Sequence, residues 1–373
     1  MSRFALTGAR IFDGETTHDN SALIVEGRRI AGIGKAPSDT EVVTLDGGLL
    51  APGFVDAQVN GGGGALFNGD PTPATIAKIA AAHRKYGTTA LLPTVITDRP
   101  EILEAAAQAI AGSAFPGVIG IHIEGPFIDV RRKGAHDPAL IREITRRDID
   151  WLKGLDCGTI MITLAPSTVP PEIVRELSDA GIIVSLGHAE ATATEVQAAL
   201  AAGARGFTHL YNAMSPLTHR APGMVGAALA DRESWCGIIA DGYHADPIAL
   251  KVAIAAKPQG KVFLVSDAMP TAAGGPASFN LQGRPVRVVS GRLELADGTL
   301  AGSNLTMDEA VRYCIASLDV GLEEALRMAS LYPAAFLRQD HVRGRLVPGF
   351  AADIVHLDAG LEVRNTWIGG VSA

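Results

Sequence analysis

The chain has 373 residues, of which 32 are basic and 40 are acidic, so its formal net charge is −8 at pH 7. With 47% hydrophobic residues it can bury a large core, which excludes disorder. It has neither a basic stripe nor an apolar run of the ~18 residues that a membrane span needs, so we expect no binding to nucleic acid or membranes.

The cellular compartment can be predicted from the cysteines and from the first residues. Cys157, Cys236 and Cys314 lie far apart and are odd in number, which argues against a disulfide framework and a thiolate metal site. The segment 1–8 has no apolar signal core. We therefore expect a cytoplasmic protein in which histidine and carboxylate side chains hold any metal.

The two ends of the chain have the same pattern of short strands separated by turns. Short alternating runs with turns at Asp13–Gly14 and Glu26–Gly27 predict strands in the first 50 residues. Strands are also predicted at Ala352–Leu357 and Val363–Ile368. We expect residues 1–51 and 347–373 to form one small β-sandwich module, and residues 52–346 to form a separate barrel.

The middle of the chain alternates short apolar runs with Ala-rich amphipathic segments. The predicted strands are Phe54–Val59, Thr89–Val95, Val118–Ile123, Thr159–Ala165, Ile182–Leu186, Gly206–Leu210, Trp235–Ala240 and Val262–Val265. The predicted helices are Thr75–Lys85, Arg99–Ala111, Glu172–Ala180, Thr192–Ala202 and Pro247–Ala256. Eight such units indicate an α/β protein with a (β/α)8 TIM-type barrel, and a doubly wound sheet is the alternative.

Residues able to bind metal follow three of these strands. Glu124, His188 and His209 each come at a predicted strand end, where barrel active sites are built. One carboxylate and two imidazoles suit Zn²⁺ or a similar divalent ion with an open position for water. Taken alone, each histidine is as readily a polar core residue, but three such residues at equivalent ends favour a metal site.

Further polar residues are candidates for chemistry and binding. Asp267 ends the eighth strand, where it is either an acid/base or a turn residue. His122 shares a strand face with Glu124, and we expect it to support a ligand rather than to bind the metal. The basic loop Gly125–His136 is either a solvated charge run or a lid that brings His136 to a substrate oxygen.

An anion site is predicted near Arg220 and His244, because both follow strands and carry suitable donors. The glycines of residues 61–64 lack the lysine and helix start of a phosphate loop, so we interpret them as tight packing at a strand end.

At these positions the chain resembles the N-acetylglucosamine-6-phosphate deacetylases of the amidohydrolase superfamily. The resemblance covers nearly the whole chain, and its motifs are Pro52–Asp56, His122–Pro126, Gly187–His188, Thr208–Met214 and Ser266–Ala268. The segment from His209 to Met214 is specific to this family, whereas Pro52–Asp56 is shared across the superfamily.

The resemblance implies a role for each matching residue. Glu124, His188 and His209 would bind the metal, Asp267 would be the acid/base, and His136 would polarise the acetyl carbonyl. The residues implied in substrate binding are Ala135, His136, Asn212, Ala213, Arg220, His244, Leu300, Ala301 and Gly302. Family members are homo-oligomers, often dimers, with part of the phosphate site donated across the interface, so we expect a homodimer or higher oligomer.

One departure from the wider superfamily bears on the metal. Members with two metals have His-x-His at the end of the first strand, where this chain has Gln58 and Asn60. The lysine that bridges two metals is absent as well, because Leu164–Pro166 stands in its place. We therefore expect one ion per chain, Zn²⁺ or alternatively Fe²⁺.

Three functional hypotheses follow. The first is metal-dependent hydrolysis of the acetamide of N-acetylglucosamine 6-phosphate to glucosamine 6-phosphate and acetate. The second is the same reaction on N-acetylgalactosamine 6-phosphate or another N-acylated amine. The third, a non-catalytic sugar-phosphate-binding protein, is disfavoured because Asp267 and all three ligands are present.

Overall fold

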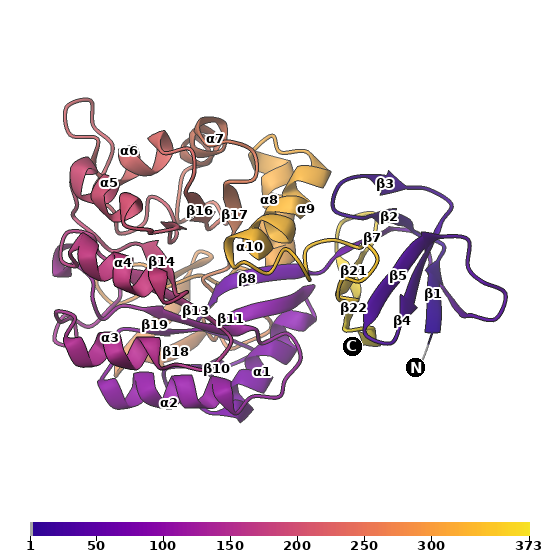
Figure 1. Cartoon of the computed structure of the whole chain (residues 1–373), viewed down its shortest axis with the longest axis horizontal. Coiled ribbons are helices and arrows are strands. Elements are labelled where there is room, and N and C mark those ends of the chain that lie inside the picture. The colour runs from indigo at the N-terminus through magenta and orange to yellow at the C-terminus, as the bar shows by residue number, and fades with distance from the viewer. Residues whose placement is uncertain (1–2) are drawn as a thin grey trace.

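The computed structural model describes residues 3–373 and contains a parallel barrel with smaller sheets attached (Figure 1). Each barrel strand pairs with the next one along the chain. The strands are β8 (Phe54–Val59), β11 (Thr88–Ile96), β12 (Gly120–Glu124), β13 (Thr159–Leu164), β14 (Ile183–Leu186), β15 (Gly206–Phe207), β16 (Trp235–Ile238) and β17 (Val262–Leu264). The order never reverses, so the predicted barrel is confirmed and the doubly wound alternative is excluded.

The barrel closes just beyond its first and last strands. Asp267 N donates to Gln58 O at 3.0 Å, and Asn60 N donates to Ala268 O at 2.9 Å. Val59 and Ala268 also form a parallel bridge. The barrel seam therefore contains the backbone of the candidate acid/base, Asp267.

Helices surround the barrel on its outer side (Figure 1). They are α1 (Pro73–Arg84), α2 (Pro100–Ala111), α3 (Arg146–Lys153), α4 (Pro171–Asp179), α5 (Ala193–Ala201), α6 (Gly223–Ala230), α7 (Pro247–Ala256), α8 (Met307–Ser317), α9 (Leu322–Ala329) and α10 (Leu331–Phe336). Their starts follow local rules: α1, α2, α4 and α7 have proline in the first turn, and Thr192 and Glu195 form a capping box for α5. Within residues 3–373, no helix is long and apolar enough to cross a membrane.

The two termini meet in a pair of small sheets at one end of the molecule (Figure 1). One sheet has the order β5 (Arg29–Gly34), β4 (Ala22–Glu26), β1 (Arg3–Thr7) and β6 (Glu41–Thr44). The other has the order β23 (Val371–Ser372), β22 (Val363–Ile368), β21 (Ile354–Leu357), β7 (Leu49–Pro52), β2 (Arg10–Phe12) and β3 (Thr17–His18). Leu6, Leu23, Leu50 and Ile354 belong to one buried cluster shared by these sheets, as expected for a sandwich.

A three-stranded sheet that the sequence analysis did not predict is inserted between β17 and α8. It consists of β18 (Ser278–Leu281), β19 (Arg284–Val289) and β20 (Arg292–Glu294). The turn before β19 places Gln282 and Gly283 at φ of 50° and 84°, values typical of a tight hairpin. Leu281 and Val286 pack in one cluster with Ala135, so the insertion borders the loop that carries His136. A shorter hairpin, β9 (Gly61–Gly62) with β10 (Ala65–Leu66), follows β8.

Candidate active site

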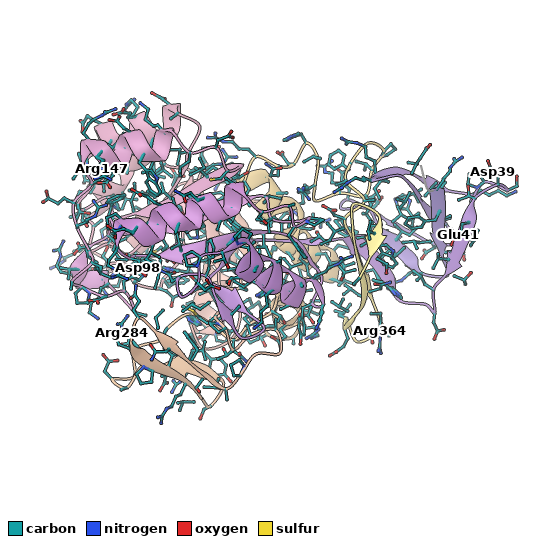
Figure 2. All side chains as sticks on the ribbon, turned by 90° about the horizontal axis from the view of Figure 1, so that it is seen from below. Asp39, Glu41, Asp98, Arg147, Arg284 and Arg364 are labelled. Atoms are coloured by element: carbon teal, nitrogen blue, oxygen red, sulfur yellow. The ribbon has the colours of Figure 1, made fainter. Side chains whose placement is uncertain are left out.

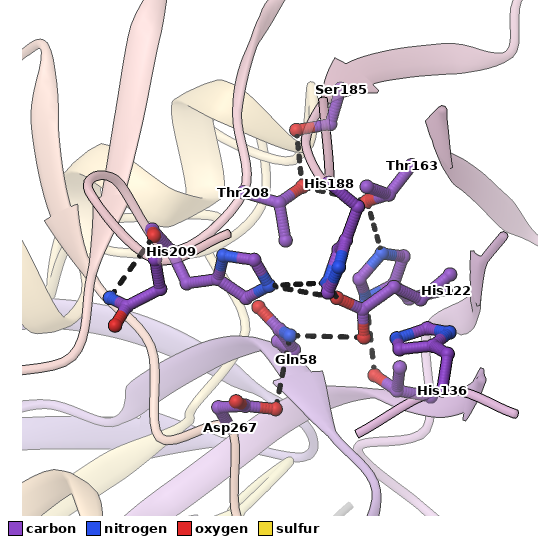
Figure 3. Close-up of polar contacts among 12 residues, drawn as sticks. Gln58, His122, His136, Thr163, Ser185, His188, Thr208, His209 and Asp267 are labelled. Carbon is purple, nitrogen blue, oxygen red and sulfur yellow. Dashed lines mark hydrogen bonds and ion pairs between the residues drawn. The ribbon is translucent and has the colours of Figure 1, made fainter. Parts of the chain in front are cut away.

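Glu124, His188 and His209 meet at the carboxyl ends of β12, β14 and β15, as predicted. Figure 3 shows the two histidines of this cluster beside each other. Glu124 Oε1 lies 3.1 Å from His188 Nε2 and 2.9 Å from His209 Nε2, and the two Nε2 atoms are 3.1 Å apart. All three side chains are buried. Three ligand atoms thus converge on one point at the barrel rim.

The chemistry of these donors fits a divalent cation. His188 Nδ1 is 2.9 Å from the carbonyl oxygen of Arg132, so this nitrogen carries the hydrogen and Nε2 presents a lone pair to the cluster. Burial opposes ionisation of Glu124, but the adjacent imidazoles of His188 and His209 hold its pKa well below the usual range. An ionised carboxylate and imidazole lone pairs at one point are the ligand set that Zn²⁺ and similar ions prefer.

The backbone turns sharply at the candidate residues. His188, His209 and Asp267 have φ of 48°, 36° and 51°, in the left-handed region that non-glycine residues seldom adopt. Such a conformation costs on the order of 1 kcal/mol or more and is typical of functional sites. All three residues follow the carboxyl end of a barrel strand, and all three line the cavity.

Asp267 lies beside the cluster and is held by two amides. Its Oδ1 accepts hydrogen bonds from Gln58 Nε2 at 3.0 Å and from Asn60 Nδ2 at 2.7 Å. Gln58 Nε2 also donates to Glu124 Oε2 at 3.2 Å, so Gln58 lies between the two carboxylates. Figure 3 shows Gln58 next to Asp267. Burial, followed by the charge of Glu124, raises the pKa of Asp267 to about 6. A carboxyl with such a pKa can exchange a proton near neutral pH.

His136 lies on another side of the cluster (Figure 3). Its ring centroid is 4.5 Å from that of His188. Its Nδ1 is 2.7 Å from Thr97 Oγ1, at the end of β11. Burial lowers the pKa of His136 well below its usual range, so the ring is neutral.

A cavity of about 400 Å³ opens over these residues. It is lined by Glu124, His136, His188, His209 and Asp267, and by most of the predicted substrate residues: Ala135, Asn212, Ala213, His244, Leu300 and Gly302. His244 Nδ1 pairs with Asp241 Oδ2 at 2.6 Å, which orients the ring at the cavity wall. The cavity combines a metal-binding cluster, a carboxyl with a raised pKa and a neutral imidazole.

Sequence and structure comparisons identify the family of this chain. The Amidohydrolase family matches residues 49–372. The chain is 47% identical over 333 residues to the N-acetylgalactosamine-6-phosphate deacetylase of Shewanella sp. (strain ANA-3), covering 87% of this chain and 83% of the relative. It is also 37% identical over 380 residues to the N-acetylglucosamine-6-phosphate deacetylase of Homo sapiens, covering 97% and 89% of the two chains.

The chain is an amidohydrolase.

Solved structures agree with this assignment over the full length of the amidohydrolase. The N-acetylglucosamine-6-phosphate deacetylase of Pasteurella multocida superposes with a TM-score of 0.96 at 33% identity, covering 100% of this chain and 99% of the other. A mutant of the N-acetyl-D-glucosamine-6-phosphate deacetylase of Mycobacterium smegmatis, in complex with N-acetyl-D-glucosamine 6-phosphate, gives a TM-score of 0.90 at 30% identity, covering 100% and 99%.

Two predicted substrate residues of the amidohydrolase do not line the cavity. Ala301 is fully buried and packs beneath the wall with Met269, so it shapes the pocket without facing it. Arg220 lies in the exposed segment 216–222 that precedes α6. Because Arg220 does not line the cavity of its own chain, its role in binding phosphate stays a prediction.

The structure adds cavity residues that the sequence analysis did not single out for binding. They are Asn60, Ile96, Arg131, Arg132, Gly134, Ile239, Met269 and Thr299. Two arginines of the basic loop have acidic partners: Arg131 pairs with Asp129, and Arg132 pairs with Glu190. These two arginines are therefore paired, and the role of the loop as a lid stays a prediction. The run of charges was visible in the sequence, but the acidic partner Glu190 lies 58 residues from Arg132.

Within residues 3–373, the hydrogen-bonding partners of His122 are hydroxyl groups rather than members of the ligand cluster. Its Nδ1 lies 3.2 Å from Thr94 Oγ1 and its Nε2 lies 2.7 Å from Thr163 Oγ1. Burial lowers the pKa of His122 to about 4. His122 therefore belongs to a buried hydroxyl network that continues from Thr163 to Thr208, and its support of a ligand stays a prediction.

Proposed function

We propose that this amidohydrolase is a metal-dependent deacetylase of N-acetylhexosamine 6-phosphates, which converts N-acetylglucosamine 6-phosphate to glucosamine 6-phosphate and acetate. The observation that carries the proposal is the convergence of Glu124, His188 and His209 with Asp267 in one cavity. The family membership and the deacetylases among the relatives support the substrate class.

Each residue of the cavity has a proposed task. Glu124, His188 and His209 hold the ion, which when bound supplies Lewis-acid polarisation and a more acidic water. Asp267 removes a proton from the attacking water while the water oxygen adds to the acetyl carbon. Asp267 then delivers this proton to the amine nitrogen as the carbon–nitrogen bond breaks, and acetate leaves.

His136 and the residues on the cavity wall stabilise and position the substrate. His136 donates a hydrogen bond to the acetyl oxygen as negative charge develops on it. His244 and Arg220 bind the phosphate, and a charged donor paired with phosphate is stronger than a neutral one. Asn212, Ala213, Leu300 and Gly302 surround the sugar, together with Ala135 and the buried Ala301.

A second candidate substrate is N-acetylgalactosamine 6-phosphate. The observation that favours it is the 47% identity to the Shewanella enzyme, against 37% to the human N-acetylglucosamine-6-phosphate deacetylase. We therefore expect the galactosamine epimer to be hydrolysed at least as efficiently as the glucosamine epimer.

The test is release of acetate from both sugar phosphates by Zn²⁺-loaded protein, with chelator-treated protein and Glu124→Gln as controls. We expect hydrolysis of at least one epimer, and loss of hydrolysis in both controls. Unphosphorylated N-acetylglucosamine should be a poor substrate. Binding of sugar phosphate without any release of acetate would refute the proposal in favour of a non-catalytic binding protein.

A further inference from the structure

Thr97 and His136 form a short hydrogen bond at the edge of the cavity. The Oγ1–Nδ1 distance is 2.7 Å, and both side chains are buried. His136 lines the cavity, and within residues 3–373 its Nε2 has no hydrogen-bonding partner. The ring is thus held through one nitrogen, and the other is available to the cavity.

The position of the hydroxyl hydrogen follows from the distances around Thr97. The hydroxyl has one hydrogen to donate and two neighbours that accept: His136 Nδ1 at 2.7 Å and the backbone oxygen of Glu124 at 3.5 Å. A contact of 3.5 Å is at the limit of a hydrogen bond, whereas 2.7 Å is near the optimum for a hydroxyl donor. The hydrogen therefore points to Nδ1. Because an imidazole keeps at least one hydrogen, His136 must carry it on Nε2.

Gly125, the residue after Glu124, provides the space that the Thr97 hydroxyl occupies. Gly125 has φ of 80°, and a Cβ atom added there would come within 2.2 Å of Thr97 Oγ1. Any other residue at this position would displace the hydroxyl. The glycine of the segment His122–Pro126 thereby permits the contact between Thr97 and His136.

The inserted sheet holds both partners from outside the barrel. Gln282 Nε2 donates to the backbone oxygen of Thr97 at 2.8 Å and to Asp98 Oδ2 at 2.9 Å. Arg284 Nη2 donates to the backbone oxygen of Ala135, the residue before His136, at 2.6 Å. Asp98 and Arg284 accordingly lie on the same side of the molecule, away from the terminal sheets (Figure 2).

We propose that Thr97 is a positioning residue that fixes His136 as the tautomer protonated on Nε2. The inserted sheet holds the backbone beside both residues, through Gln282 at Thr97 and Arg284 at Ala135. The inference rests on the proposed function, because a fixed Nε2–H donor is what an acetyl oxygen with developing negative charge requires. A ring protonated on Nδ1 would present a lone pair to that oxygen and repel it.

The direct test is the tautomer of His136, measured by long-range proton–nitrogen NMR on Zn²⁺-loaded protein with labelled histidine. The His136 signals are assigned by their loss in His136→Gln. We expect Nε2 to carry the hydrogen in the wild type and in Thr97→Ser, and a mixture of tautomers in Thr97→Val. A wild-type ring protonated on Nδ1, or on both nitrogens, would overturn the proposal.

Kinetics give the second readout. Thr97→Val should lower kcat about tenfold with little change in KM, the scale of one neutral hydrogen bond, and Thr97→Ser should retain most of the activity. The matched control is Thr94→Val, which removes the hydroxyl next to His122 and should leave the His136 signals unchanged. Unaltered tautomer and kcat in Thr97→Val would also refute the proposal.

The two proposals fail separately. If the wild type does not hydrolyse acetamides but His136 is protonated on Nε2, only the proposed function is wrong. If Thr97→Val does not fold, the wild-type spectrum and Thr97→Ser still decide the tautomer.

Discussion

Gln58 Nε2 donates to Asp267 Oδ1 at 3.0 Å, and it reaches Glu124 Oε2 at 3.2 Å with the same nitrogen. Asn60 adds a second amide donor to Asp267. In both residues the side-chain NH₂ group, which cannot ligate a cation, faces the carboxylates. The place where superfamily members with two metals have their first-strand histidines thus contains hydrogen-bond donors.

We predict about one tightly bound divalent ion per chain, because the Glu124, His188 and His209 cluster offers one set of ligands. Elemental analysis after gentle purification measures the stoichiometry. Removal of the ion should lower the melting temperature, since the ion binds the folded state. Glu124→Gln should reduce the metal content, and two tightly held ions per chain would contradict the prediction.

We predict that Asp267→Asn lowers kcat by roughly 10²–10⁴-fold, because the amide cannot accept a proton from water. Metal content and KM should change little, since the three ligands and the cavity wall remain. A turn aspartate without a catalytic role would instead give near-normal turnover and a stability loss of about 1 kcal/mol. Turnover, metal content and melting temperature of one preparation distinguish the two.

Arg220→Ala should lower kcat/KM for the phosphorylated substrate about ten- to hundredfold, as expected for loss of one charge-assisted bond of roughly 1.5–3 kcal/mol. The kcat/KM for the unphosphorylated sugar should not change. Steady-state kinetics with both sugars measure the difference, and an equal loss on both would show that the phosphate site lies elsewhere.

Arg220 is exposed and outside the cavity of its own chain, so its action on a partner subunit can be tested. If Arg220 acts across an interface, as the resemblance implies, mixing Arg220→Ala chains with Asp267→Asn chains should restore activity above that of either alone. Mixed oligomers without any recovery would place its action within one chain.

Asp56 should make stability depend on pH. Burial raises its pKa from 3.8 to about 7, and its Oδ2 has no hydrogen-bonding partner within residues 3–373. Between pH 3.8 and about pH 7 the folded state keeps a proton on Asp56 that the unfolded state has lost. The free energy of unfolding therefore falls as pH rises through this window, by on the order of 4 kcal/mol. Asp56→Asn should lose this dependence in denaturation curves at about pH 4 and pH 8, whereas the exposed control Asp39→Asn should retain it.

The barrel could be predicted from sequence because buried parallel strands are continuous apolar runs, and residues at their carboxyl ends must share one rim. That rule brought Glu124, His188, His209 and Asp267 together without any contact information. The inserted sheet was missed although Gln282–Gly283 is flanked by alternating residues, because its strands are short and partly exposed. Thr97 and Arg284 give no local signal, since their importance comes from contacts with distant segments. The resemblance named Ala301 and Arg220 as substrate residues, yet neither lines the cavity. A matching motif therefore identifies residues without showing whether their side chains face the pocket.

The seam of the barrel affects the proposed base more directly than the proposed metal site. Asp267 N bonds to Gln58 O and Asn60 N bonds to Ala268 O, so the proposed base and the amides that hold it come from the two ends of the barrel sequence, more than 200 residues apart in the chain. The proposed metal ligands follow β12, β14 and β15, which lie away from the seam in the strand order. We therefore expect a substitution that loosens the seam to lower turnover more than metal content.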